Sequence, residues 1–461
     1  MADTYDVDLV VLGSGGAAMA AGITARRAEA QVVLIERATI GGTCVNVGCV
    51  PSKTLLAGAG VRHALLHNPF AGVPTSAGSA DFGAMVSQKE DLTAWLRQHK
   101  YTDVADAWHF PVRKGEARFV DERTVEVNGD LLRSRAYIIA TGSEPVTSGI
   151  EGIDGVHFLT STTAMELADV PESLVIIGGS YVGMEQAQLF AHLGARVTLI
   201  GKLAPKAEPE LRQVMRDAFT HDGITVIEER GLKVSNDSRQ VTVTTESGGQ
   251  AVGQQLLVAT GRRSDTSALN LAAAGVETDH NGFISIDQHQ RTTNPRIFAA
   301  GDVAGTPQFV YVAAASGRAA ATNALARQGN PSSVDYTGLP AVTFTRPQLA
   351  SAGLTEEQAL ERGYQCDCRT LSLGDVPRAL VNHDTRGAVK LVSDATTGKV
   401  VGVHAAADGA GEMMLAATYA IRAGMTIEDV ADTWAPYLTM AESLRLTAGL
   451  FRGNLPTSCC A

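Results

Sequence analysis

The stretch Asp6-Val-Asp-Leu-Val-Val-Leu-Gly-Ser-Gly-Gly-Ala-Ala18 decides the fold class of this chain. Its apolar run predicts a buried strand, and Gly13, Gly15 and Ala18 follow at the spacing of a dinucleotide-binding turn. An alanine-rich stretch and then Gln31-Val-Val-Leu-Ile-Glu36 predict a helix and a second strand. In such a unit the first glycine permits a tight turn, and the second lets the backbone approach a pyrophosphate at the helix start. We therefore predict a dinucleotide site in which Glu36 binds a ribose hydroxyl.

A second unit of the same kind begins at Ser173-Leu-Val-Ile-Ile177 and continues as Gly178-Gly-Ser180-Tyr181-Val-Gly183. A helix to about Leu193 and a strand over Arg196–Ile200 are expected to complete it. Gly201 occupies the position that Glu36 has in the first unit, and Lys202 follows it. An ammonium group without a carboxylate favours a 2′-phosphate, so NADPH is predicted in preference to NADH. The alternative, that Lys202 is a solvated surface lysine, stays open.

The remaining pattern sets the domain organisation. Ile138-Ile-Ala-Thr141-Gly142 and Leu257-Val-Ala-Thr-Gly261 each predict a buried strand that ends in a glycine turn, and each follows one dinucleotide unit. From about Tyr336 the pattern changes to strands followed by helices. We predict an α/β protein with two Rossmann-like domains, the second inserted in the first, and a C-terminal α+β dimerisation domain. The expected boundaries are 1–150 with 266–335 for FAD, 151–265 for NADPH, and 336–461 for the interface domain.

Composition excludes several classes of protein. The 461 residues are 45% hydrophobic and 19% charged, which argues against disorder. A net charge of −11 argues against nucleic acid or an anionic membrane as the main partner. No apolar stretch approaches the ~18 residues of a membrane span, and the acidic N-terminus does not resemble a secretory signal. We expect a soluble, cytoplasmic protein without stable membrane association.

The six cysteines fall in three pairs, and Gly41-Gly-Thr-Cys44-Val-Asn-Val-Gly-Cys49-Val-Pro-Ser-Lys53 is the most informative segment. We expect a helix from Pro51 to about Leu66, whose dipole would stabilise a thiolate and lower its pKa. Gly48 and Pro51 would deform the first turn and let the sulfurs close a disulfide. A static disulfide is improbable in a reducing cytoplasm, and zinc lacks two further ligands nearby. The segment predicts a redox-active pair.

Together these motifs resemble the FAD-dependent pyridine nucleotide-disulfide oxidoreductases over the whole chain. The resemblance implies a homodimer that binds FAD and NADPH. It also implies that Lys53 pairs with Glu185 near the flavin and that Tyr181 gates the nicotinamide pocket, for which core packing is the alternative. The cofactor-binding residues expected from motif and resemblance are Gly13, Gly15, Gly16, Ala18, Glu36, Ala38, Thr43, Lys53, Ala117, Thr141, Gly142, Asp302 and Val310 for FAD, and Gly178, Ser180, Tyr181, Gly183, Lys202 and Gly261 for NADPH.

The C-terminus narrows the family. Disulfide reductases of this family need a C-terminal histidine as acid–base catalyst, yet no histidine follows His404, and Tyr437 occupies the matching position. The chain ends in Ser458-Cys459-Cys460-Ala461, and vicinal thiolates suit a soft cation. Pro307-Gln-Phe-Val-Tyr311 and Val376-Pro-Arg-Ala379 add to a resemblance to the members that reduce Hg(II). Many of those carry an N-terminal metal-binding domain, and we expect a catalytic core without it.

This resemblance implies a metal path through four cysteines. Hg(II) bound to two small thiols would pass to Cys459 and Cys460 of the partner subunit and then to Cys44 and Cys49. Tyr181 and Tyr437 would stabilise thiolates through phenol hydrogen bonds. Two alternatives stay open, namely a reductase of a small-molecule disulfide and a flavoprotein that sequesters or senses metal. The third pair, Cys366 and Cys368, is expected to be two surface or interface cysteines, and we assign it no role.

Overall fold

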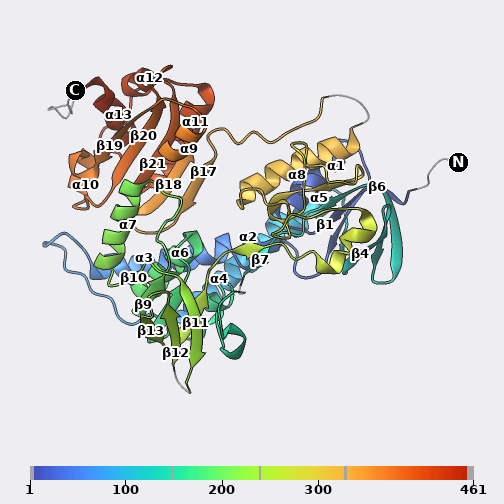
Figure 1. Ribbon diagram of the computed structural model, residues 1–461, viewed down its shortest axis with the longest axis horizontal. Helices are drawn as coiled ribbons and strands as arrows, with labels where there is room; N and C mark the ends of the chain where they lie inside the picture. The colour runs from blue at the N-terminus through green and yellow to red at the C-terminus, as the bar shows by residue number, and fades with distance from the viewer. Residues whose placement is uncertain (1–4, 147–148, 238–239, 327–329, 454–461) are drawn as a thin grey trace. The chain divides into compact units, whose positions relative to one another are not determined.

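The computed structural model describes residues 5–146, 149–237, 240–326 and 330–453. The chain divides into two compact units, shown with their elements in Figure 1. The first unit comprises 1–54, 84–146 and 261–335, and the second comprises 55–83, 147–260 and 336–461. Each unit is therefore built from segments that are distant in the sequence.

The first unit contains a seven-stranded sheet whose parallel part is the dinucleotide-binding fold. The sheet order is β3 (Val112–Lys114), β2 (Val32–Glu36), β1 (Val7–Leu12), β6 (Asp130–Ile139), β5 (Thr124–Val127) and β4 (Ala117–Asp121), and β16 (Ile297–Ala299) also pairs with β6. Strands β4, β5 and β6 form an antiparallel meander. The short strands β7 (Glu144–Pro145) and β15 (Arg262–Arg263) pair separately. The helices are α1 (Gly16–Arg27), α2 (Gly42–Asn46), most of α4 (Phe82–Arg97), α5 (Asp103–Ala107) and α8 (Val310–Leu325).

Strand β1 explains why the apolar run of the sequence becomes the centre of this sheet. Leu9 and Val11 pack into one hydrophobic cluster together with residues of α1 and α8. Val10 and Leu12 pack into a second cluster with residues of β4 and β5. A strand that is buried on both faces reads as a continuous apolar run rather than an alternating one. The end of β1, where the glycine turn begins, is thereby fixed in the middle of the sheet.

The nucleotide-binding half of the second unit repeats this plan. Four parallel strands lie in the order β10 (Thr225–Ile227), β9 (Arg196–Ile200), β8 (Ser173–Ile177) and β14 (Gln255–Val258). Helix α6 (Tyr181–Leu193) connects β8 to β9, and α7 (Pro209–His221) connects β9 to β10. An antiparallel sheet of β11 (Gly231–Asn236), β12 (Val241–Thr245) and β13 (Gln250–Gly253) completes this half.

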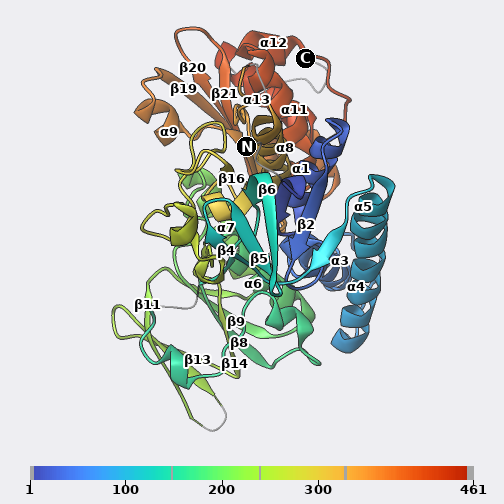
Figure 2. The same ribbon diagram turned by 90° about the vertical axis from the view of Figure 1, so that its right-hand side faces the viewer.

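The C-terminal half of the second unit is an antiparallel sheet with helices. Its order is β17 (Pro340–Thr343), β18 (Gln348–Gly353), β21 (Val400–Ala407), β20 (Ala388–Asp394) and β19 (Cys366–Ser372). The helices are α9 (Glu356–Glu361), α10 (Pro377–Val381), α11 (Ala410–Ala423), α12 (Ile427–Asp432) and α13 (Glu442–Gly449). Figure 2 shows α11 and α13 beside this sheet, and buried residues of both helices share one core cluster with its strands.

The predicted fold class is confirmed, with differences in detail. The redox helix, α3 (Cys49–Leu66), begins two residues before the expected Pro51, because a proline in a first helical turn loses no hydrogen bond. The short helix α2 and the strand β18 were not predicted. None of the described helices is both long enough and apolar enough to span a bilayer.

Candidate active site

The two helices α2 and α3 bring Cys44 and Cys49 together. Cys44 lies inside α2 and is partly buried, whereas Cys49 is exposed and is the first residue of α3. The Asn46 side-chain amide donates hydrogen bonds of 3.0 Å to the carbonyls of Ile40 and Gly42, which holds the start of α2. Arg97 Nε in turn donates to Asn46 Oδ1 at 2.8 Å. The loop around the sulfur pair is therefore fixed by side chains that lie outside the two cysteines.

The two sulfurs are chemically unequal. The pKa of Cys44 is raised because it hydrogen bonds to Cys49, because it is buried, and because a charge on Cys49 repels a second one; the Lys53 ammonium opposes this rise. The lowered pKa that the sequence predicted is therefore wrong for Cys44. Cys49, at the start of an 18-residue helix, lies where the helix dipole stabilises negative charge. Within the pair, a negative charge on Cys49 therefore disfavours ionisation of Cys44.

Two side chains beside the pair were missed by sequence reasoning. Burial, followed by the charges of Cys44 and Cys49, raises the pKa of Tyr101 to about 12, so its phenol stays protonated. Burial lowers the pKa of Arg262, while the charges of Asp302 and Cys49 oppose that change, which places a guanidinium within electrostatic reach of Cys49. Arg262 directly follows the Ala-Thr-Gly261 turn, and that position was the available signal. Tyr101 lies in a π-helical turn without any motif.

The predicted FAD residues form a cradle at the end of β1. Gly13 has φ +113°, and a Cβ there would lie 2.4 Å from the carbonyl oxygen of Ala140, so only glycine fits. Glu36, at the end of β2, accepts from Ser14 Oγ at 2.5 Å and from the Ala38 amide at 2.7 Å. A carboxylate has further acceptor positions for a ribose hydroxyl. The close backbone approach and the acid at the strand end fit FAD.

The other residues expected near FAD come from several elements of the first unit. Gly15 precedes α1, which begins at Gly16 and contains buried Ala18; Thr43 lies in α2, Lys53 in α3, Ala117 in β4, and Thr141 and Gly142 follow β6. Val310, at the start of α8, is 39% exposed and packs against Gly16. Burial raises the pKa of Asp302, although Ser143 Oγ donates to its carboxylate at 2.9 Å. Arg262 Nε donates to the same Ser143 hydroxyl at 2.8 Å.

Most residues predicted for the nicotinamide nucleotide lie at the start of α6 or close to it in the second unit. Ser180 is the N-cap residue of this helix and Tyr181 is its first residue. A Cβ on Gly183 would lie 1.8 Å from the Gly178 carbonyl oxygen, so the third glycine of the motif is required by helix–strand packing. Lys202 is exposed just after β9, and Gly261 is exposed after β14. Backbone approach, a helix start and a nearby ammonium group fit a dinucleotide phosphate.

Other predicted catalytic residues of the second unit are placed as follows. Glu185, in α6, is buried and accepts from the Phe344 amide at 3.0 Å. Tyr181 is 36% exposed, and partial burial raises its pKa. Tyr437 is 52% exposed between α12 and α13. Cys459 and Cys460 lie outside the described residues. Pairing of Lys53 with Glu185 stays a prediction.

The last histidine of the chain is held by the fold. His404, on β21, is 2% exposed, and its Nε2 lies 2.8 Å from the Leu354 carbonyl oxygen. Burial lowers its pKa, so the ring stays neutral at ordinary pH. His404 therefore does not supply the proton shuttle whose absence the sequence indicated.

Comparison with known proteins identifies the family. The family model "Pyridine nucleotide-disulphide oxidoreductase" matches residues 7–317, and its dimerisation domain matches residues 339–448. The chain belongs to the pyridine nucleotide-disulphide oxidoreductase family. The predicted family is thus confirmed; the enzyme is an oxidoreductase, and FAD and a nicotinamide dinucleotide are its cofactors.

Similar members of this family have names that describe metal chemistry. The mercuric reductase of Streptomyces lividans is 50% identical over 98% of this chain and 98% of its own length. The mercuric reductase of Lysinibacillus sphaericus is 46% identical over 100% of this chain and 85% of its own. Among solved structures, the Cu(II) complex of the HOCl-induced flavoprotein disulfide reductase RclA from Escherichia coli matches with a TM-score of 0.85 at 29% identity, covering 95% of this chain and 98% of that one.

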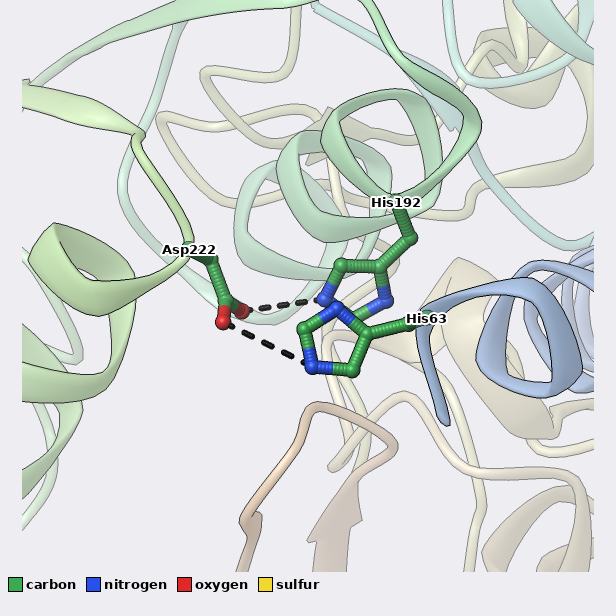
Figure 3. Close-up of side chains that lie close together, drawn as sticks. All are labelled: His63, His192 and Asp222. Carbon is green, nitrogen blue, oxygen red and sulfur yellow. Dashed lines mark hydrogen bonds and ion pairs between the residues drawn. The ribbon is translucent and has the colours of Figure 1, made fainter. Parts of the chain in front are cut away.

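This oxidoreductase also contains a histidine–aspartate cluster that the sequence did not predict. His63 of α3, His192 of α6 and Asp222, which follows α7, direct their polar atoms toward one another (Figure 3). His192 Nε2 lies 2.9 Å from Asp222 Oδ2, and His63 Nε2 lies 3.8 Å from Oδ1. The two imidazoles are stacked, with centroids 3.9 Å apart and planes at 29°. Nothing in the motif pattern signals three residues so distant in sequence.

The surroundings of this cluster favour a structural role over a metal site. Nearly parallel rings cannot both direct an in-plane nitrogen lone pair at one ion. Burial lowers the pKa of His63, and the charge of Arg346 lowers it further. The charge of Asp222 also raises the pKa of Arg386. Positive groups therefore already lie near the cluster. Burial alone would raise the pKa of Asp222, but the hydrogen bond and charge of His192 outweigh it and lower that pKa. The carboxylate ties α3, α6 and the end of α7 together.

Proposed function

We propose that this enzyme reduces mercuric ion with NADPH, in the reaction NADPH + Hg(II) → NADP⁺ + H⁺ + Hg(0). The observation that carries the proposal is the 50% identity to a mercuric reductase over 98% of both chains. The adjacent Cys44 and Cys49 supply the soft ligands that such an ion prefers. The two electrons of one hydride equal the two electrons that Hg(II) accepts. The cradle around Gly13 and Glu36 would hold FAD, which would supply hydride acceptance and two-electron transfer to the sulfur pair.

The residues of the chain have separable roles in this proposal. Cys49, at the helix start, holds the thiolate nearer the flavin, and Cys44 faces the metal. Lys53 and Arg262 stabilise negative charge on the pair, since the charge of each acts on one of the two sulfurs. Cys44 binds Hg(II) as its thiol proton leaves to a departing small thiol, so no step requires an unligated cation.

Selectivity for NADPH is assigned to Lys202. Its ammonium is exposed directly after β9, where a 2′-phosphate would lie beside it, and the residue that follows the strand is Gly201 instead of an acid. The carboxylate nearby, that of Glu228, accepts from the Leu203 amide and pairs with Arg216. Lys202→Ala is expected to raise the KM for NADPH and leave that for NADH unchanged, with a loss of about 1.5–3 kcal/mol for one charged hydrogen bond. Lys114→Ala, which removes an exposed lysine of β3, is the control. Equal use of NADH and NADPH by the wild type would refute the assignment.

Metal delivery is assigned to the C-terminal residues Ser458-Cys459-Cys460-Ala461, here called the tail. In a homodimer, Cys459 and Cys460 of the partner subunit receive Hg(II) from a complex with two small thiols and pass it to Cys44 and Cys49. Tyr181 and Tyr437 donate phenol hydrogen bonds to thiolates along this path. The dimerisation domain supports a homodimer, and the buried, neutral ring of His404 argues against disulfide reduction. The cytoplasm, where small thiols are abundant and reduced, is the proposed location.

Turnover tests the proposed reaction directly. Purified holoenzyme with NADPH and Hg(II) in excess cysteine should oxidise NADPH and release volatile mercury in equal amounts over many cycles. Cys44→Ala and Cys49→Ala should each abolish mercury release while the protein keeps FAD. A protein that sequesters metal would instead stop after a stoichiometric amount, and a disulfide reductase would consume NADPH with oxidised glutathione or cystine. Either outcome would overturn the proposal.

Mixed dimers test whether the tail of one subunit delivers metal to the active site of the other. Cys459→Ala/Cys460→Ala and Cys44→Ala/Cys49→Ala should each have little activity toward thiol-bound Hg(II). A mixed dimer has one site with all four cysteines only if the tail acts on the other subunit. Activity above both parents after verified subunit exchange supports the crossing, and no recovery contradicts it. The tail variant should still accept hydride from NADPH, which controls for folding.

A further inference from the structure

The third pair of cysteines lies on the C-terminal sheet. Cys366 and Cys368 lie at the start of β19, the edge strand of that sheet, and α9 lies beside it (Figure 2). Residues two apart on a strand project from the same face. Both side chains are partly buried. The alternation therefore sets two sulfurs side by side at the edge of the sheet.

Both sulfurs face the same residue, Glu356, at the start of α9. The Sγ of Cys366 lies 3.9 Å from the main-chain oxygen of Glu356. Cys368 contributes to the lowered pKa of Glu356, after the larger effect of Lys390. The thiol of Cys366 thus lies beside the first turn of α9, and Cys368 follows on the same face of the strand.

The local charge favours a cation. Burial raises the pKa of Cys366, and the negative charges of Glu356, Asp394 and Glu208 raise it further. The Lys390 ammonium opposes this rise. Lys390 is itself held by three carboxylates, with Nζ to Glu356 at 2.7 Å and to Glu208 at 3.0 Å. Carboxylates therefore outnumber ammonium groups around the thiols. The histidine cluster of Figure 3 has the opposite balance, because arginines surround its one carboxylate.

The same surroundings disfavour a disulfide between these two cysteines. Burial, followed by the charge of Glu356, raises the pKa of Cys368 to about 12 and also raises that of Cys366. A protonated thiol is a poor nucleophile, so it forms a disulfide slowly and binds a metal ion only when that ion displaces its proton. Cα atoms two residues apart on a strand are about 6.6 Å apart, at the upper end of the range that disulfides span. The pair is suited to remain as two thiols.

We propose that Cys366 and Cys368 bind one Hg(II) as a bis-thiolate, with a Glu356 oxygen as a third and weaker ligand. The exchange is balanced: Hg(SR)₂ and two cysteine thiols give the protein-bound complex and two RSH, so each proton leaves with a departing small thiol. Rotation about the first side-chain torsion, which has two common positions in strands, lets the sulfurs converge on one ion. The choice of Hg(II) as the ligand rests on the proposed function.

Two thiols on one strand should outcompete separate small thiols. Once one sulfur has displaced a small thiol, the second attacks at a high effective concentration, and such linkage adds a factor on the order of 10²–10⁴ in affinity. Loss of either cysteine should therefore cost roughly 100-fold in apparent affinity. Loss of the Glu356 carboxylate should cost much less, because carboxylate is a harder ligand than thiolate.

Binding is tested in a full-length, FAD-loaded variant in which Cys44, Cys49, Cys459 and Cys460 are all alanine. Hg(II) is supplied with excess cysteine; mercury is then counted by intact-protein mass spectrometry after desalting, and accessible thiols are counted by a colorimetric thiol reagent. We expect one Hg(II) per chain and protection of both thiols. A further Cys366→Ser or Cys368→Ser change should remove the bound metal, and Glu356→Gln should retain it with lower affinity. Flavin content and melting temperature control for folding.

The outcomes separate this site from the proposed function. Absence of bound mercury in the four-alanine variant, or mercury retained after Cys366→Ser/Cys368→Ser, would overturn the site. Mercury release by the otherwise wild-type enzyme is measured separately with and without Cys366→Ser/Cys368→Ser. If the wild type releases no Hg(0) but the four-alanine variant binds one Hg(II), the proposed function fails and the site stands.

Discussion

Lys390 carries the largest stability prediction that the structure supports. This lysine of β20 is 2% exposed, and its Nζ contacts Glu208 Oε2 at 3.0 Å, Glu210 Oε1 at 3.0 Å and Glu356 Oε2 at 2.7 Å. Burial alone would lower the pKa of Lys390, but the hydrogen bonds from the three carboxylates outweigh it and raise that pKa. Lys390→Met would keep the apolar stem and remove the charge. The buried Glu208 carboxylate would then lose its ammonium partner.

The loss of stability in Lys390→Met can be estimated from the hydrogen bond that Glu208 keeps. Breaking a buried ion pair by removing one partner costs about 3–5 kcal/mol. Glu208 Oε1 still accepts from the Glu356 amide at 2.7 Å, so the lower figure, about 3 kcal/mol, applies. For a unit of this size that corresponds to a fall of roughly 6–12 °C in melting temperature. The assay is thermal unfolding of the FAD-loaded protein at fixed concentration and at about neutral pH, monitored by circular dichroism.

Two variants test whether the loss of stability in Lys390→Met arises because the charges are buried. Glu210→Gln removes a carboxylate that contacts the same ammonium but is 46% exposed, so it should cost less than about 1 kcal/mol. Lys390→Met/Glu208→Gln removes both buried charges and should recover much of the loss. A Lys390→Met protein that melts within about 2 °C of the wild type, or a double variant no more stable than Lys390→Met, would refute the reasoning.

Two further predictions concern the histidine cluster and the FAD cradle. Burial, followed by the charge of His192, lowers the pKa of His63 to about 4; between that pH and about 6.5 the unfolded chain binds a proton that the folded chain does not, so stability falls as the pH falls through this window. His63→Asn should reduce the difference in melting temperature between about pH 7 and about pH 5, and an unchanged difference would contradict the assignment. Gly13→Ala should yield protein without flavin absorbance, because its Cβ would lie 2.4 Å from the Ala140 carbonyl oxygen, whereas Gly72→Ala, with no atom within 4 Å, should keep its flavin.

The elements that the sequence predicted well share a physical cause. Ser173–Ile177 and Arg196–Ile200 were expected with the bounds that β8 and β9 have. Each is an apolar run buried within a parallel sheet, and glycines or charged residues mark its ends. Patterns of this kind are local, so no knowledge of the tertiary fold is needed to find them. The dinucleotide turns belong to the same class, because their glycines are demanded by nearby backbone.

The contacts that the sequence did not predict join residues far apart in the chain. Lys390 lies 182 positions from Glu208, and neither belongs to a motif. A buried lysine is rare unless it is paired, yet no local pattern tells a reader that the lysine within an apolar strand is buried. The beginning of α3 was missed for a different reason. Pro51 suggested a helix start, but a first helical turn accepts proline at several of its positions.

A comparison of the two described cysteine pairs shows why residue type and spacing do not determine chemistry. Cys44 and Cys49 come from two helices that are adjacent in the sequence, so their sulfurs meet, and cationic side chains act on them. This arrangement fits the proposed electron transfer through the pair. Cys366 and Cys368 project in parallel from one strand among carboxylates, and the pKa of each is raised. The two pairs therefore differ in how a negative charge on sulfur is stabilised: a helix start and cations favour it at Cys49, whereas burial and carboxylates oppose it at Cys366 and Cys368, so that a metal ion must displace the proton there before it binds.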